Sequence, residues 1–160
     1  MLAANRSWGS PWTNRTLAVT AVADSAGMSL PADLAALADE EFVLLRTFRK
    51  SGVGVDTPVW VARHDDHLVV STPDGTGKLK RLRNNPRVEL QPCGRRGAPR
   101  LGTEMVAGTA EVSRDPAVRA GAEKALAGKY RWQWSVAMLV EKVVRRGRSQ
   151  PRPVLLIGAP

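Results

Sequence analysis

A glycine-containing bend followed by basic residues is the first feature of this chain that could do chemistry. Residues 71–90 read STPDGTGKLKRLRNNPRVEL, and a short helix is expected to begin near Lys78. Glycines let backbone N–H groups approach a ligand closely, and a helix start offers unpaired N–H groups and a positive dipole end. Ser71 and Thr72 add hydroxyl donors before the bend. These groups could bind one phosphate, whereas a basic run by itself predicts only a solvated surface.

The bend matches the phosphate loop of nucleotide triphosphatases only in part. That loop requires a glycine at position 72, where this chain has Thr72. It also requires Ser or Thr after the lysine to hold magnesium, where this chain has Leu79. The sequence therefore disfavours a nucleotide triphosphatase.

The other reactive residue types do not form a catalytic constellation. His64 and His67 flank two aspartates in RHDDH, which is typical of a hairpin turn and leaves little room for a Ser-His-Asp triad. Cys93 has no histidine nearby in sequence to lower its thiol pKa, so we interpret it as a core or pocket-lining thiol. Trp60 could stack on a flat ring or fill the core. We expect no catalytic side chain and no metal site, so an enzymatic activity would require a cofactor.

Positive charge is concentrated in the middle of the chain. The 160 residues carry a formal net charge of +9. Residues 75–103 contain eight basic residues, a single acid, Glu89, and no aromatic residue. Clustered charge attracts anionic partners, but single-stranded nucleic acid is bound with interleaved aromatics on which bases stack. A basic nucleic-acid-binding β-barrel without enzymatic activity is therefore an alternative that the sequence disfavours.

The order of the expected elements indicates a mainly β protein with a few helices. Pro58 lies within one expected strand and favours an edge position or a bulge there. The polar tip RHDDH joins that strand to the next as an antiparallel pair. Six or so mostly antiparallel strands predict an α+β barrel or roll. Helices are expected at 31–41, 78–83 and 115–146, and strands at 41–50, 55–63, 68–73, 87–93, 105–113 and 152–159.

The last expected helix carries an apolar stripe. Val136, Leu139, Val140 and Val143 recur at helical spacing. Trp132 and Trp134 border this stripe, and we interpret both as packing residues, either in the core or in a dimer.

Residues 1–27 differ in composition from the remainder. Their apolar core LAVTAVA is short and is interrupted by Thr20, which disfavours a secretory signal. We interpret 1–27 as a disordered tail or as sequence before a true start at Met28, and 28–160 as the cofactor-binding domain. The single cysteine fits a reducing compartment and hence a cytoplasmic location. No stretch reaches the roughly 20 apolar residues of a membrane helix.

Several segments, taken in order, resemble one family of oxidoreductases. FVLLRTFRKSG, TPVWVA, GKLKRLRNNPRVELQPC and GTAEV are similar to flavin and deazaflavin oxidoreductases related to pyridoxamine 5′-phosphate oxidase. The similarity is greatest to the PPOX class that depends on the deazaflavin coenzyme F420, and it covers residues 41–113. It implies a split β-barrel homodimer with two cofactor sites at the subunit interface. It also implies F420 as cofactor, with FMN as the alternative, and hydride transfer to or from a small conjugated organic substrate.

The same resemblance implies which residues bind the cofactor. Its phosphate would lie against the bend, with Lys78 as the main cation and Arg81 as a second one. Its ring would rest on the second strand, and the fourth strand would come near the pocket. A broad basic surface suits the acidic tail of F420 better than it suits FMN. The implied cofactor-binding residues are Thr57, Pro58, Val59, Trp60, Ser71, Thr72, Thr76, Gly77, Lys78, Arg81, Pro92 and Cys93.

Overall fold

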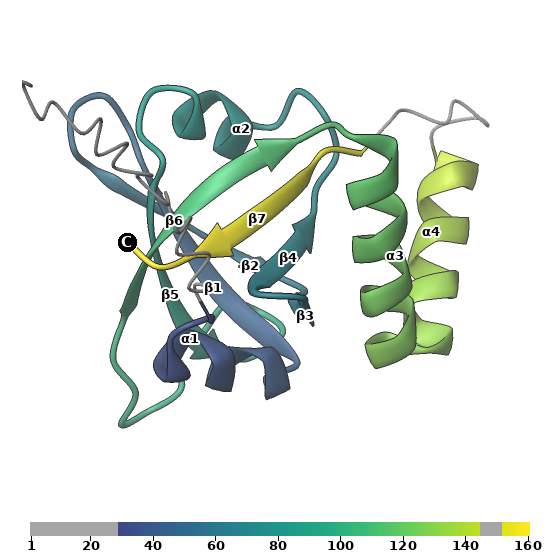
Figure 1. Ribbon diagram of the computed structural model, residues 1–160, viewed down its shortest axis with the longest axis horizontal. Coiled ribbons are helices and arrows are strands. Elements are labelled where there is room, and N and C mark those ends of the chain that lie inside the picture. The colour runs from purple at the N-terminus through teal and green to yellow at the C-terminus, as the bar shows by residue number, and fades with distance from the viewer. Residues whose placement is uncertain (1–28, 145–151) are drawn as a thin grey trace, which may run out of the picture.

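The computed structural model describes residues 29–144 and 152–160, which form one seven-stranded sheet flanked by helices (Figure 1). All strand pairs are antiparallel, in the order β2-β1-β5-β6-β7-β4-β3. The predicted α+β class, mainly β with a few helices, is confirmed. The strands are β1 (Phe42–Phe48), β2 (Gly54–Val59), β3 (Ala62–His64), β4 (His67–Ser71), β5 (Arg87–Cys93), β6 (Val106–Ser113) and β7 (Val154–Gly158). The helices are α1 (Ala32–Ala36) with the 3-10 turn η1 (Leu37–Asp39), α2 (Gly77–Leu82), α3 (Pro116–Tyr130) and α4 (Trp132–Val144).

The sheet curls because its two edge strands are consecutive in the chain. Only Trp60 and Val61 separate the end of β2 from the start of β3, which lies at the opposite edge. The prediction of one strand over 55–63 is therefore wrong. The apolar run VWV gives no local signal of a break, but the Val61 N–H donates to the Tyr130 hydroxyl at 3.0 Å rather than to a neighbouring strand. Pro58 falls on an edge strand, as its type predicts.

Apolar side chains form two clusters, one on each side of the sheet. The first fills the barrel and is covered by α1 and α2, which contribute Leu34, Leu79 and Leu82. Leu79 and Leu82, three positions apart on α2, are 2% and 5% exposed. The second cluster lies between the sheet and α3 and includes Leu126 and Tyr130. Burial on both sides fixes the sheet against α2 on one side and α3 on the other, and so fixes the positions of the side chains that the sheet carries.

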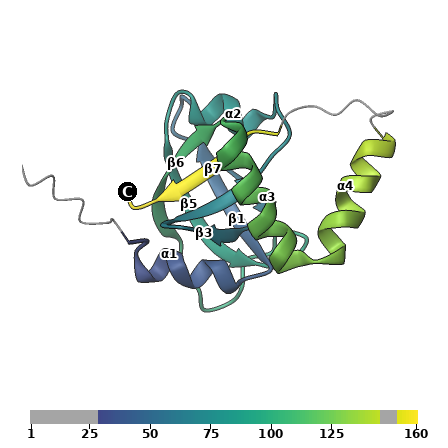
Figure 2. The same cartoon turned by 45° about the vertical axis from the view of Figure 1, so that its right-hand side comes forward.

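The predicted helix over 115–146 is two helices. Asp115 caps α3, since its carboxylate accepts the Ala117 N–H at 2.7 Å, and Pro116 occupies the first helical position. Arg131, with φ of 48°, interrupts the helix in the left-handed region. The following helix, α4, leans away from the sheet beyond α3 (Figure 2). The residue at which the helix is interrupted is neither glycine nor proline, so the sequence pattern could not locate the interruption.

Two expectations concern residues outside the described ranges. The tail over 1–27 lies there, as do the last two residues of the predicted helix, 145–146. Within the described ranges, every helix is too short or too polar to cross a bilayer.

Candidate functional site

A cavity of about 230 Å³ lies where β2, β4, α2 and α4 approach one another. We name it the cationic cavity because Lys78 and Arg152 both line it. Five of the expected cofactor-binding residues meet here, although the sequence places them up to 20 positions apart. The lining consists of Pro58, Val59, Trp60, Ser71, Lys78, Trp134, Ala137, Met138 and Arg152.

Lys78 lies in the first turn of α2 and points to this cavity. Its ammonium donates to the Thr72 hydroxyl at 3.1 Å. Burial lowers the pKa of Lys78 from its ordinary 10.5, and the positive charges of Arg152 and Arg81 lower it further. Within the described residues, no acidic side chain offsets this repulsion at Lys78. Bringing in an anion would remove the repulsion, so the electrostatics of the cavity favour a negatively charged group.

Several hydroxyl groups lie close to the Lys78 and Arg152 cations. Thr72 is fully buried, and its Oγ1 lies 3.5 Å from that of Thr76. The Arg152 Nε donates to the Ser71 hydroxyl at 3.0 Å. The site therefore holds two cations and several hydroxyls in one place, which is the combination that binds phosphate oxygens.

Arg152 was not among the expected binding residues. It precedes β7 and reaches Ser71 across 81 positions of sequence. The only signal in the sequence was that Arg152 belongs to a second run of basic residues near the end of the chain, with Lys142, Arg145, Arg146 and Arg148. The pairing of β7 with β4, which brings Val154 opposite Ser71, places Arg152 at the site.

Arg81 supports the cationic cavity from outside its lining. Its Nε donates to the buried Thr47 hydroxyl at 2.7 Å, and burial, together with the charge of Arg49, lowers its pKa. A side-chain carbon at Gly77 would lie 3.0 Å from the Arg81 guanidinium. Glycine at this position therefore lets the guanidinium fold back against the start of α2.

Trp60 forms the wall between the cationic cavity and the rest of the site. Its ring stacks on Tyr130 with centroids 5.0 Å apart and lies 5.8 Å from the ring of Trp134. The Trp60 Nε1 is buried and has no hydrogen-bond partner within the described residues. A buried N–H without an acceptor is costly and rare, so this atom requires an explanation.

A second cavity, of about 510 Å³, opens on the other side of Trp60, between β1 and α4. We name it the apolar cavity, since most of its lining side chains are apolar. Trp60 and Ala137 belong to both linings, which makes the two cavities neighbours. The lining consists of Glu41, Phe42, Trp60, Arg95, Trp132, Gln133, Val136, Ala137 and Val140.

The remaining expected residues lie outside both linings. Thr57 stands on β2 opposite Leu45, and Pro92 and Cys93 end β5 opposite β1. Cys93 is buried, and burial raises the pKa of its thiol. Four more of the expected residues also lie outside both linings: Thr72, Thr76, Gly77 and Arg81. Of these, Thr72 accepts a hydrogen bond from Lys78, and the charge of Arg81 lowers the pKa of Lys78, as described above.

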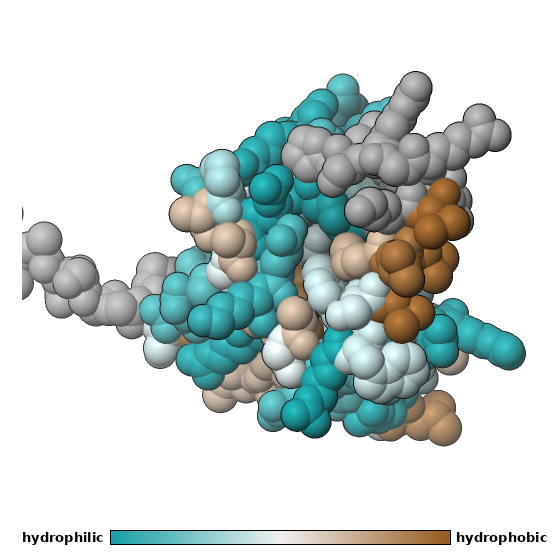
Figure 3. Space-filling model, turned by 90° about the vertical axis from the view of Figure 1, so that its right-hand side faces the viewer, coloured by the Kyte–Doolittle hydropathy of each residue, from teal (hydrophilic) through white to brown (hydrophobic). Residues whose placement is uncertain are grey.

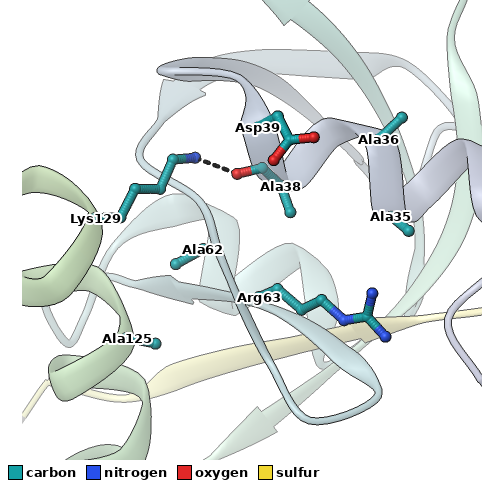
Figure 4. A pocket seen from close by; sticks show the side chains of 8 residues that line it. All are labelled: Ala35, Ala36, Ala38, Asp39, Ala62, Arg63, Ala125 and Lys129. Carbon is teal, nitrogen blue, oxygen red and sulfur yellow. Dashed lines mark hydrogen bonds between the residues drawn. The ribbon is translucent and has the colours of Figure 1, made fainter.

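A third cavity, of about 440 Å³, lies between α1 and α3 and contains Lys129 (Figure 4). The Lys129 ammonium donates to the backbone carbonyls of Ala38, Glu40 and Val61 at 2.5–2.7 Å. An ammonium has three donors, so all of them are used in holding η1 to the barrel. Lys129 is therefore a structural residue.

The two histidines lie at a hairpin, as predicted. His64 and His67 are directly paired at the ends of β3 and β4, and neither lines the cationic or the apolar cavity. In the described part of the chain, His, Cys, Asp and Glu side chains do not gather in groups of three or more that could hold a metal ion.

Known structures with the same fold come from several bacteria. A conserved hypothetical protein of Mycobacterium tuberculosis superposes with a TM-score of 0.58 at 19% identity, over 81% of this chain and 79% of that one. HutZ, the heme storage protein of Vibrio cholerae, gives 0.55 at 12% identity, over 83% and 92%. A putative 5-nitroimidazole antibiotic resistance protein of Bacteroides thetaiotaomicron gives 0.55 at 12% identity, over 79% and 77%. At these identities the likeness establishes the fold alone.

The sequence itself matches one family model over most of its length. No curated protein matches the chain significantly. The model described as pyridoxamine 5′-phosphate oxidase matches residues 30–155, which include strands β1 to β6, the start of β7 and the linings of both main cavities. The chain therefore belongs to the pyridoxamine 5′-phosphate oxidase family, with its split β-barrel fold.

Proposed function

We propose that this protein is an oxidoreductase that binds the deazaflavin coenzyme F420 in the cationic cavity and acts on a small conjugated organic substrate. The observation that carries the proposal is the half-buried Lys78 ammonium, held beside Arg152 and Arg81 with a lowered pKa. Such a group is best stabilised by an anion, and a cofactor phosphate supplies one. Membership in a family named for a flavin-type oxidase supports the oxidoreductase class.

Each part of the site has a task in this proposal. Lys78 and Arg152 would hold the phosphate, with Ser71 and Thr72 presenting their hydroxyls. Trp60 and the adjoining end of β2 would support the ring. When bound, a reduced deazaflavin supplies a hydride to an electrophilic acceptor. The chain itself orients the ligands, and Trp134 and Met138 of α4 cover the cavity and exclude water.

F420 is favoured over FMN by the surface beyond the cavity. Lys80 and Arg83 are exposed on and just after α2, next to the phosphate site. Cations there would attract the carboxylates of the F420 tail, which FMN lacks. An FMN-dependent reductase or oxidase of the same fold is the alternative, because the cavity by itself recognises only the shared phosphate.

The proposal also includes a homodimer, supported by an exposed apolar face of α4. We name it the α4 stripe, and its residues cluster on one side of the molecule (Figure 3). Their side chains are 46–70% exposed, which is unusual for a contiguous set of large apolar residues and typical of an interaction surface. The stripe consists of Trp132, Val136, Leu139, Val140 and Val143.

Light scattering after size-exclusion chromatography tests the homodimer. The wild type is expected to elute at twice the chain mass, and Leu139→Glu is expected to shift it toward the monomer with unchanged helix content. A wild type that is monomeric across a wide concentration range refutes this part of the proposal.

Calorimetric titration tests the cofactor. The purified protein is titrated with F420, with FMN, and with the phosphate-free ribityl form of each. We expect F420 to bind most tightly, and loss of the phosphate to weaken binding at least tenfold, as expected for a charge-assisted contact. Tighter binding of FMN would establish the alternative cofactor. If neither binds, the site has been misread, and binding of single-stranded DNA at low salt would then favour the basic nucleic-acid-binding barrel.

Hemin is a useful further titrant, because HutZ is described as a heme storage protein and shares the fold. The apolar cavity has room for a flat macrocycle, but neither histidine lines it. We therefore expect no histidine-type heme spectrum, and its appearance would favour a heme-binding role instead.

A further inference from the structure

The two cavities at Trp60 are arranged to receive one ligand with two different ends. The cationic cavity supplies charge, and the apolar cavity supplies Phe42, Trp132 and Val136. A ligand anchored by its phosphate at Lys78 would meet Trp60 as it extends from the first cavity toward the second. Trp60 is therefore placed to contact the part of the ligand that follows the phosphate, and in any flavin or deazaflavin this part includes the ring.

The Trp60 indole is held rigidly by its neighbours. Its ring stacks on Tyr130 at an interplanar angle of 21°, and the rings of Phe42 and Trp134 lie 6.3 Å and 5.8 Å away. Tyr130 is fixed in turn, because its hydroxyl lies 2.7 Å from the Glu41 carbonyl and 2.9 Å from that of Val61. The direction of the Trp60 N–H is therefore set before any ligand arrives, which lowers the entropic cost of using it.

This oriented N–H lacks an acceptor in the protein. The Trp60 Nε1 is buried and unpartnered within the described residues, although tryptophan indoles normally find a partner when buried. An acceptor from a ligand would satisfy it. Because the nitrogen has no exposed surface in the ligand-free fold, a neighbouring group must shift when that acceptor enters.

We propose that Trp60 is a ligand-positioning residue whose indole N–H donates a hydrogen bond to a carbonyl oxygen of the bound ring system. The assignment rests on the proposed function in so far as the ring belongs to a flavin-type cofactor. The carbonyl is the acceptor that F420 and FMN share, whereas the ring nitrogen at position 5 of FMN is replaced by carbon in a deazaflavin. The donor thus fixes how the ring sits relative to the phosphate.

Nitrogen-15 spectra of the indole groups test this directly. The chain has five tryptophans, and the Trp60 signal is identified by its loss in Trp60→Phe. Addition of F420 or FMN is expected to move the Trp60 indole proton downfield, as hydrogen bonding does. Inorganic phosphate is expected to leave this proton unchanged, because it occupies only the cationic cavity. A shift with FMN alone would show that the position-5 nitrogen is the acceptor and would overturn the carbonyl assignment.

Trp60→Phe supplies the matching affinity measurement, since phenylalanine keeps a ring on Tyr130 and removes the N–H. Loss of one hydrogen bond is expected to weaken F420 and FMN roughly five- to tenfold, with binding of inorganic phosphate unchanged. Ring ligands that bind the wild type without moving the Trp60 proton refute the inference and leave the proposed function standing. Failure of both ring ligands to bind the wild type refutes the proposed function and this inference together.

Discussion

Replacement of Lys78 by methionine should separate ligand affinity from protein stability. In the ligand-free protein, Lys78→Met removes one hydrogen bond, from Nζ to the Thr72 hydroxyl, worth about 1 kcal/mol. It also removes a partly buried charge that Arg152 and Arg81 repel. The two effects are of opposite sign, so the free energy of unfolding should change by less than about 1 kcal/mol.

The effect on phosphate-bearing ligands should be much larger. A charge-assisted hydrogen bond contributes about 1.5–3 kcal/mol, so F420 or FMN should bind roughly tenfold to more than a hundredfold more weakly. Calorimetric titration measures the affinity, and urea denaturation measures the stability. Lys80→Met, an exposed position on the same helix, is the matched control and should change neither the stability nor, by more than a fewfold, the affinity.

The pH dependence supplies an independent check on the same residue. The folded pKa of Lys78 is lowered from 10.5, so the unfolded chain keeps this proton to higher pH than the folded chain. Its contribution to the free energy of unfolding must then rise as pH approaches 10.5 from below. Lys78→Met should lack this rise. A loss of stability above about 2 kcal/mol in the variant, with ligand affinity unchanged, would refute the assignment of Lys78 as an anion-binding residue.

Three further predictions concern the scaffold. Burial raises the pKa of Tyr130, the only tyrosine, to about 12. The absorbance of its phenolate should therefore appear near pH 12 in the folded protein. Because the unfolded chain loses this proton near pH 10, the free energy of unfolding should fall between pH 10 and pH 12, by up to about 3 kcal/mol. A phenolate midpoint near 10 would contradict this. Lys129→Met removes the ammonium donor from three backbone carbonyls, of which Val61 keeps its hydrogen bond from the Tyr130 hydroxyl, and should destabilise the protein by about 2–3 kcal/mol in urea. Exposed Lys124→Met should cost below about 0.5 kcal/mol; equal effects would argue against the structural role. Gly108→Ala places a carbon 3.0 Å from the Gly158 carbonyl oxygen and should lower the free energy of unfolding by about 1–3 kcal/mol, and an unchanged denaturation midpoint would show that β6 and β7 can separate without cost.

Local sequence signals were sufficient for most of the strands and for the bend before α2. The fourth strand was predicted at 87–93, where β5 lies, because β-branched and apolar residues there are bounded by Asn-Pro and by glycine. Lys78 was assigned from a glycine bend and a helix start, both of which are properties of neighbouring residues. The histidine hairpin likewise followed from adjacent aspartates.

Features that depend on contacts between distant segments were missed. The strand break at Trp60 and Val61 depends on Tyr130, which lies 69 positions from Val61. α3 ends at Arg131, which has a positive φ although it is neither glycine nor proline, so no local residue type predicts the end of the helix there. The exposure of the α4 stripe is also a tertiary property, since helical spacing shows that apolar residues share a face but not what that face contacts.

The sequence by itself determined the fold class, the antiparallel strands and Lys78 as an anion-binding candidate, because all three depend on residues close together in the chain. The tertiary structure alone decided that Arg152 joins Lys78, that Trp60 separates a cationic cavity from an apolar one, and that the Trp60 indole N–H is left without an acceptor. These depend on the register of β7 against β4 and on the contact of Trp134, on α4, with Trp60. Strand register and helix placement are set by packing across the whole barrel, which no local pattern encodes.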